Sequence, residues 1–168
     1  MPEYKLIYFN VRGRAEITRW IFEYSGIPYT DERIEKDDWP ERKKDIKGGK
    51  LPVLMVDGKM LPQSLAIARY VAKEAGLVPE DALQAAYCDA LADTAFELLP
   101  EWYKFKTSEK SEEEKKKEFE EVLYPKFLEP IMSRLDKRLQ EKEWFVSDKV
   151  SPRNFHVSDR YFQVTARH

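Results

Sequence analysis

The residue types that carry most enzyme chemistry are sparse in this chain. Both histidines, His156 and His168, lie near the C-terminus, and the single cysteine, Cys88, belongs to no Cys-x-x-Cys pair. Zinc sites and histidine-based nucleophilic triads therefore lack their usual parts. Other groups must carry any chemistry, and the first candidate is Tyr8, which ends an apolar run and precedes Arg14 by six positions.

Taken alone, Tyr8 has an ordinary structural explanation. An aromatic residue at the end of a strand usually packs into the core, and an arginine at the start of a helix is usually a surface residue. The surrounding sequence, Tyr-Phe-Asn-Val-Arg-Gly-Arg-Ala-Glu at 8–16, changes that balance toward a functional role. How strongly this segment supports a functional role for Tyr8 depends on the other motifs in the first half of the chain.

Composition narrows the protein classes. The 168 residues are 42% hydrophobic and 13% aromatic, which indicates a globular chain of one or two domains. Twenty-nine Lys and Arg against 31 Asp and Glu leave no net positive field, which disfavours nucleic acid as a partner. One cysteine and no leader-like segment predict a cytoplasmic protein, and no apolar run is long enough for a membrane span.

Hydrophobic periodicity predicts alternating strands and helices in the first half. A strand at 3–9 is followed by a helix from Arg14 to Tyr24, whose apolar residues recur at helical spacing. The elements expected next are a strand at 28–34, a short helix beginning near Pro40, strands at 53–56 and 59–61 joined by Asp57-Gly58, and a buried helix at 65–72. The predicted order is β-α-β-α-β-β-α.

Beyond residue 76 only helical patterns remain. One apolar stripe runs from Leu83 to Leu98 and is interrupted by Pro100. Ser111 and Glu114 form a capping-box pattern that opens a second long helix, which we expect Pro125 and Pro130 to bend. We predict four parts: a first domain at 1–76, a linker at 77–82, a helical domain at 83–146 and a tail of different character at 147–168.

Four segments together resemble the sigma class of cytosolic glutathione transferases, which includes the glutathione-dependent prostaglandin D synthases. They are residues 8–16, 38–40, 49–54 and 62–70, and their order and spacing match as well. The resemblance extends to about residue 146. It implies a thioredoxin-like α/β N-terminal domain that binds glutathione and an all-α C-terminal domain that supplies most of the pocket for an electrophile.

The resemblance also implies roles for individual residues. Tyr8 occupies the position whose hydroxyl donates to the glutathione sulfur, and Arg14 the position that supports this tyrosine electrostatically. The pKa of a free thiol is about 8.5. A hydrogen bond that lowers this pKa by one unit stabilises the thiolate by about 1.4 kcal/mol. Further glutathione contacts are implied for Trp39, Lys43, Gly49, Lys50, Leu51, Pro52 (as a cis-proline), Gln63 and Ser64. Each of these also has an ordinary structural explanation, as a surface charge, packing residue, strand start or helix cap.

A homodimer is a further implication of the resemblance. Asp93 or Glu97 would approach the glutathione of the partner subunit, although such an acidic stripe is usually only solvated. Phe9 and Trp102 are expected to line the pocket for a small hydrophobic electrophile. Related prostaglandin synthases use neighbouring aspartates for metal activation, but Phe96 occupies one expected acidic position, so no metal is predicted.

The resemblance ends after residue 146, where family members continue through further helices. We therefore expect an incomplete helical domain, as in an alternative transcript or altered reading frame. The primary prediction is a glutathione transferase that attacks an electrophile, with prostaglandin D isomerase or peroxidase activity as specific forms. The alternatives are a glutathione-binding or crystallin-like structural protein, and a truncated isoform with little turnover.

Overall fold

The structure is a computed structural model that describes residues 1–141 together with 145 and 146. The chain divides into two compact units, one ending at Val78 and the other beginning at Pro79, and each has its own hydrophobic cluster. The predicted tail at 147–168 lies outside the described residues. None of the described helices is both long and apolar enough to span a membrane.

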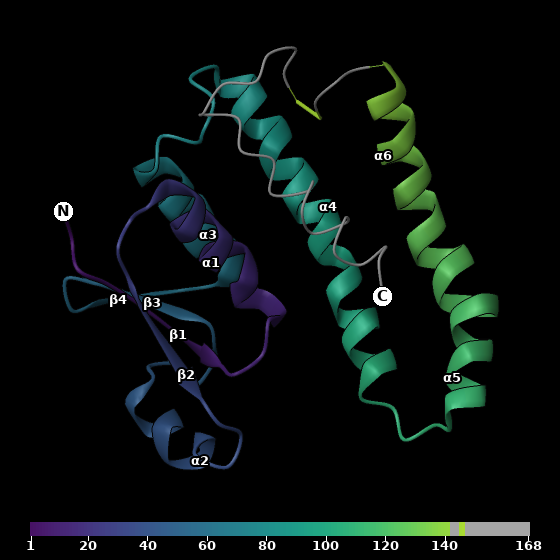
Figure 1. Cartoon of the computed structure of the whole chain (residues 1–168), viewed down its shortest axis with the longest axis horizontal. Helices are drawn as coiled ribbons and strands as arrows, with labels where there is room; N and C mark the ends of the chain where they lie inside the picture. The colour runs from purple at the N-terminus through teal and green to yellow at the C-terminus, as the bar shows by residue number, and fades with distance from the viewer. Residues whose placement is uncertain (142–144, 147–168) are drawn as a thin grey trace. The chain divides into compact units, whose positions relative to one another are not determined.

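The first unit has the predicted β-α-β-α-β-β-α order and a thioredoxin-like arrangement (Figure 1). Its four strands lie in the order β2-β1-β3-β4; β1 pairs parallel with β2 and antiparallel with β3, and β3 pairs antiparallel with β4. The elements are β1 (Tyr4–Phe9), η1 (a 3-10 helix, Gly13–Ala15), α1 (Glu16–Ser25), β2 (Thr30–Ile34), α2 (Trp39–Arg42), η2 (Lys43–Asp45), β3 (Val53–Val56), β4 (Lys59–Pro62) and α3 (Ser64–Glu74).

One face of the sheet is covered by α1 and α3, which lie side by side in Figure 1 and contact each other. From β1, Tyr4 packs against Phe22 of α1 at 5.4 Å and Tyr70 of α3 at 6.5 Å between ring centroids. Burial and a hydrogen bond with Tyr70 raise the pKa of Tyr4 to about 12. This phenol therefore stays protonated in the core.

The alternation of β1 separates the two aromatic residues at its end. Successive side chains of a strand point to opposite faces, so Tyr8 shares a face with Tyr4, and Phe9 shares the other with Ile7. Ile7 is buried in a second cluster, and the Phe9 ring lies 5.3 Å from the ring of Trp39 at the start of α2. The strand therefore directs Tyr8 toward α1 and Phe9 toward α2.

Three local features bear on the predicted elements of the first unit. Asp57 and Gly58 both have positive φ, 47° and 76°, which is the pattern of the predicted two-residue hairpin turn between β3 and β4. The helix predicted from Arg14 begins with a 3-10 turn and becomes α-helical only at Glu16. Tyr24, predicted on its apolar stripe, is 55% exposed.

The second unit consists of helices alone in its described part. The chain runs along α4 (Ala82–Lys106), reverses, and returns along α5 (Glu112–Glu118), the π-helix η3 (Phe119–Leu128) and α6 (Glu129–Glu141) (Figure 1). Its core cluster contains Ile131, Leu135 and Phe145, against which Leu91, Leu98 and Val146 pack.

Prolines alter this unit differently from the sequence prediction. Pro100 does not interrupt the first helix, because α4 continues through it to Lys106. Pro125 lies inside the π-helix, and since proline has no N–H it cannot make the ordinary α-helical bond to the carbonyl four residues earlier. At the end of this segment the Glu129 N–H donates to the Tyr124 carbonyl, five residues back. The helix type thus changes around Pro125, whereas Pro130 lies in the first turn of α6.

The predicted capping box is present at the start of α5. The Ser111 N–H and the Ser111 hydroxyl each donate to the Glu114 carboxylate at 2.8 Å, and the Glu114 N–H donates to the Ser111 hydroxyl oxygen at 3.3 Å. The two bonds to the carboxylate, the backbone one first, hold the pKa of the Glu114 carboxyl below its ordinary value. The ionised form is therefore the one that the folded cap stabilises.

The capping box predicts that the stability of the first turn of α5 depends on pH. Its contribution to stability is present above the ordinary carboxyl pKa of unfolded glutamate, about 4.3, and is lost as pH falls through the lower folded value. We expect an NMR titration to give a lowered pKa for Glu114. Ser111→Ala should raise that pKa only part of the way to the ordinary value, because it removes the hydroxyl donor and keeps the backbone N–H donor. Ser133→Ala, an exposed change in α6, should leave it unaltered. An unchanged Glu114 titration in Ser111→Ala would contradict this account.

Candidate functional site

The end of β1 places a phenol against the backbone of the next turn. The Arg14 N–H donates to the Tyr8 hydroxyl oxygen at 3.2 Å. Because a phenol can accept and donate at once, its own proton remains available to a second partner. Tyr8 is 8% exposed, so most of its side chain is buried.

Gly13 makes this contact possible. Its φ is +45°, and a Cβ placed on it would lie 2.8 Å from the Tyr8 hydroxyl oxygen. Any L side chain would therefore be strained in the backbone and would also push the phenol away. The Arg-Gly-Arg sequence brings Gly13 to the one position where the missing Cβ leaves room for the hydroxyl.

A cavity of about 460 Å³ opens beside this turn in the first unit. Its volume lies within the range of about 300–1,000 Å³ that is usual for small-molecule sites. It is lined by Phe9, Arg14, Trp39, Gly49, Lys50, Leu51, Pro52, Pro62, Gln63 and Ser64. Eight of the residues predicted for glutathione binding are thus brought together, with Phe9 from the predicted electrophile pocket beside them.

Tyr8 and Lys43 are the two predicted glutathione contacts that do not line the cavity. Tyr8 lies next to it, since its sequence neighbour Phe9 and its hydrogen-bond donor Arg14 both line the wall. Lys43 packs its aliphatic chain over Gly49, because a Cβ on that glycine would lie 2.8 Å from the lysine Cε. Its role is therefore to support a wall residue in this structure.

One wall of the cavity is main chain held in unusual conformations. The Leu51–Pro52 peptide bond is cis, as the resemblance implied. Gln63 has φ +77°, an uncommon conformation for a residue other than glycine, and Ser64 follows it as the first residue of α3. Strained residues of this kind persist where the surroundings hold them, and they are concentrated at functional sites.

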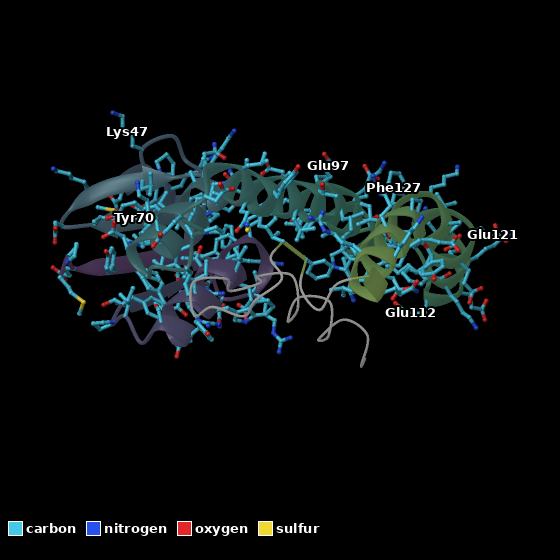
Figure 2. All side chains as sticks on the ribbon, turned by 90° about the horizontal axis from the view of Figure 1, so that it is seen from above. Lys47, Tyr70, Glu97, Glu112, Glu121 and Phe127 are labelled. Atoms are coloured by element: carbon cyan, nitrogen blue, oxygen red, sulfur yellow. The ribbon has the colours of Figure 1, made fainter. Side chains whose placement is uncertain are left out.

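The electrostatics of the cavity suit an anionic ligand. Among its lining residues, all of them in the described first unit, Arg14 and Lys50 are cationic and none is a carboxylate. The start of α3 adds unpaired backbone N–H groups and the positive end of the helix dipole near Ser64. Lys47, by contrast, is exposed and extends away from the first unit in Figure 2.

The predicted residues of the second unit are not part of this cavity. Asp93 and Glu97 are exposed on α4, where Figure 2 labels Glu97. Trp102 is 40% exposed, with the Lys106 amine 5.6 Å from its ring centre. Burial and the nearby Asp89 raise the pKa of the Cys88 thiol, which is the opposite of an activated nucleophile. Within the described residues, no three His, Cys, Asp or Glu side chains are grouped as metal ligands.

Two features of the site escaped sequence reasoning. Pro62 lines the cavity because β4 ends there, a placement that only the hairpin register determines. Arg19 is 4% exposed beneath the turn, although it lies off the apolar stripe of α1 and a charged residue at such a position is normally solvated. The sequence does contain acidic residues that could pair with a buried Arg19. They are too numerous to indicate which arginine is buried.

Comparisons with known proteins identify the family and the fold. The family model described as "Glutathione S-transferase, N-terminal domain" matches residues 4–73. The chain is 46% identical to the haematopoietic prostaglandin D synthase of Gallus gallus over 158 residues, which cover 93% of this chain and 76% of that protein.

Solved structures show the same fold. The structure of Na-GST-3, a glutathione S-transferase of Necator americanus described as monomeric, has a TM-score of 0.82 at 32% identity, covering 98% of this chain and 82% of that one. Rat hPGDS complexed with a quinoline has a TM-score of 0.78 at 39% identity, covering 98% of this chain and 79% of that one.

The contact between Gly13 and Tyr8 predicts that Gly13→Ala loses both stability and activity. The positive φ should lower the free energy of unfolding by about 1–2 kcal/mol. The added methyl should also displace the Tyr8 hydroxyl and impair any reaction that depends on it. Thermal unfolding and activity measured on the same sample check both effects.

Gly58→Ala is the matched control for this change. Gly58 also has positive φ, +76°, but open space surrounds its missing Cβ. It should show a comparable loss of stability with full activity per folded molecule. Equal activity in the two variants would contradict the role assigned to Gly13.

Proposed function

The chain belongs to the glutathione S-transferase family and is similar to its sigma class, and we propose that it activates glutathione for attack on a small hydrophobic electrophile. The observation that carries the proposal is the Tyr8 hydroxyl, held by the Arg14 N–H at 3.2 Å beside a cavity with cationic side chains. Glutathione is a tripeptide with two carboxylates and a thiol, so it presents anions to such a wall.

The proposed chemistry uses the proton of Tyr8 without removing it. The glutathione thiol loses its proton to water, and the Tyr8 O–H donates a hydrogen bond to the resulting thiolate. This bond favours the anion and so lowers the thiol pKa. The thiolate then attacks an electrophilic carbon; a carbon–sulfur bond forms, and a leaving group departs with its electron pair.

The remaining contacts assign the ends of glutathione to different parts of the wall. We propose that the Leu51 backbone pairs with the cysteinyl part and that Gln63 and Ser64 take the γ-glutamyl carboxylate at the start of α3. Trp39, Lys43 and Lys50 would surround the glycyl end. The absence of carboxylates among the lining residues of the first unit supports this placement.

Relatives suggest which electrophile to test first. The Gallus gallus relative and the rat structure are prostaglandin D synthases by name, so prostaglandin D isomerisation is the first specific reaction we propose, with peroxidase activity next. Phe9 and Trp102 remain our candidate residues for binding the electrophile, as the resemblance implies. A cytoplasmic location, predicted from the single cysteine, belongs to the same proposal.

Tyr8→Phe tests the proposed reaction. Removing the hydroxyl should raise the pKa of the bound glutathione thiol. The rate of conjugation of a chloronitrobenzene substrate should fall about tenfold for each unit by which that pKa rises. Binding to immobilised glutathione should survive. Tyr4→Phe, which removes a phenol from the same face of β1, should reduce stability without changing the thiol pKa. A glutathione-binding protein without turnover would show retained binding and negligible conjugation in the unaltered chain.

We also propose a homodimer in which α4 of one subunit approaches the glutathione of the other. Asp93 and Glu97, both exposed on α4, are the candidates for the contact with the glutathione amine. Light scattering should give twice the chain mass of 19.9 kDa, and Glu97→Gln should weaken glutathione binding. Na-GST-3 is described as monomeric, so a single-chain mass with unimpaired binding in Glu97→Gln would reject this arrangement.

A further inference from the structure

A buried arginine lies directly beneath the turn that carries Gly13 and Arg14. Arg19 comes from α1 and is 4% exposed. Its Nε lies 3.1 Å from each carboxylate oxygen of Asp31, which belongs to β2. Its Nη1 donates to the Glu16 carboxylate at 3.1 Å. The guanidinium is therefore held by acidic residues from two elements.

The same guanidinium also contacts the turn itself. Its Nη1 donates to the main-chain carbonyls of Val11 at 2.9 Å and Arg12 at 3.4 Å. These two residues lead directly into Gly13 and Arg14, whose backbone determines the position of the Tyr8 hydroxyl. Arg19 therefore connects the turn to α1 and β2 at once.

A third contact brings Arg19 to the phenol ring. Its Cζ lies 5.9 Å from the centre of the Tyr8 ring, within the range of cation–π attraction. The ring and the backbone that holds its hydroxyl are thus fixed by one side chain.

We propose that Arg19 is a positioning residue for the reaction, acting on the Tyr8 hydroxyl through the turn at 10–14. This inference rests on the proposed glutathione activation. Arg19 does not line the cavity, and its effect passes through the backbone of Val11 and Arg12 and through the Tyr8 ring. It keeps the phenol at the distance from Arg14 that leaves the O–H proton directed to the ligand.

The burial of this arginine is not fully compensated by hydrogen bonds. Its Nη2 is buried without a hydrogen-bond partner among the described residues, which is an unfavourable state for a charged group. The planar guanidinium offers separate nitrogens to Asp31 and to the turn carbonyls. A lysine ammonium has one nitrogen, so it cannot reproduce both sets of contacts.

Arg19→Lys tests this proposal, because it keeps the positive charge near Asp31 and Glu16 and removes the planar guanidinium. The readouts are thermal unfolding, the pKa of bound glutathione from the ultraviolet absorbance of its thiolate, and kcat and KM for conjugation. We expect a folded protein in which the thiol pKa rises by about one unit and kcat falls about tenfold. The KM for glutathione should change little, because the cavity wall is intact.

Arg12→Lys is the matched control, because Arg12 lies in the same turn and is exposed. It should leave the thiol pKa and kcat unchanged. Asp31→Asn provides a second route if Arg19→Lys does not fold: it weakens the hold on Nε while Arg19 remains, and should shift the thiol pKa in the same direction. A folded Arg19→Lys with an unchanged thiol pKa, or an unchanged pKa in Asp31→Asn, would overturn the proposal.

Tyr8→Phe separates this inference from the function on which it rests. If Tyr8→Phe raises the thiol pKa and Arg19→Lys does not, only the role of Arg19 is rejected. If neither variant moves it, the assignment of Tyr8 as the thiolate donor is rejected as well. In Arg19→Lys, amide hydrogen exchange at Arg14 should accelerate, whereas an unaltered rate would show that Arg19 does not hold the turn.

Discussion

The position of one phenol oxygen depends on the backbone of the turn that follows it. The Tyr8 hydroxyl accepts from the Arg14 N–H at 3.2 Å, and Gly13 leaves the space that a Cβ would fill. A backbone donor holds the oxygen in place more firmly than a mobile side chain could, because it loses no rotamer freedom. The phenol proton is thereby left for a ligand rather than consumed by the fold.

The charges around this turn are arranged in two layers. Beneath it, the carboxylates of Glu16 and Asp31 are paired with Arg19, and Asp31 also receives Arg33 at 2.7 Å. Above it, the cavity wall carries Arg14 and Lys50. Pairing these two partly exposed acids with arginines offsets their negative charge near the cationic wall. The same arginine thus serves the electrostatics and the geometry of the turn.

Much of the fold followed from short-range patterns in the sequence. The apolar run of β1, the Asp57-Gly58 turn and the Ser111 capping box each depend on residues a few positions apart, and all three are present. The motif segments that resemble the family also converge on one cavity. One prediction failed at a proline: α4 continues through Pro100, although proline has no N–H to bond the carbonyl four residues earlier.

The sequence by itself determined the order of elements, the tyrosine at the end of the first strand and the glycine that follows it, because these depend on local backbone preferences and side-chain alternation. Only the tertiary structure decided that Arg19 is buried and that Pro62 lines the cavity. It also decided that Arg14 meets the phenol through its backbone N–H. These facts depend on which segments the sheet brings together, and a periodic pattern carries no information about contacts between residues distant in the chain.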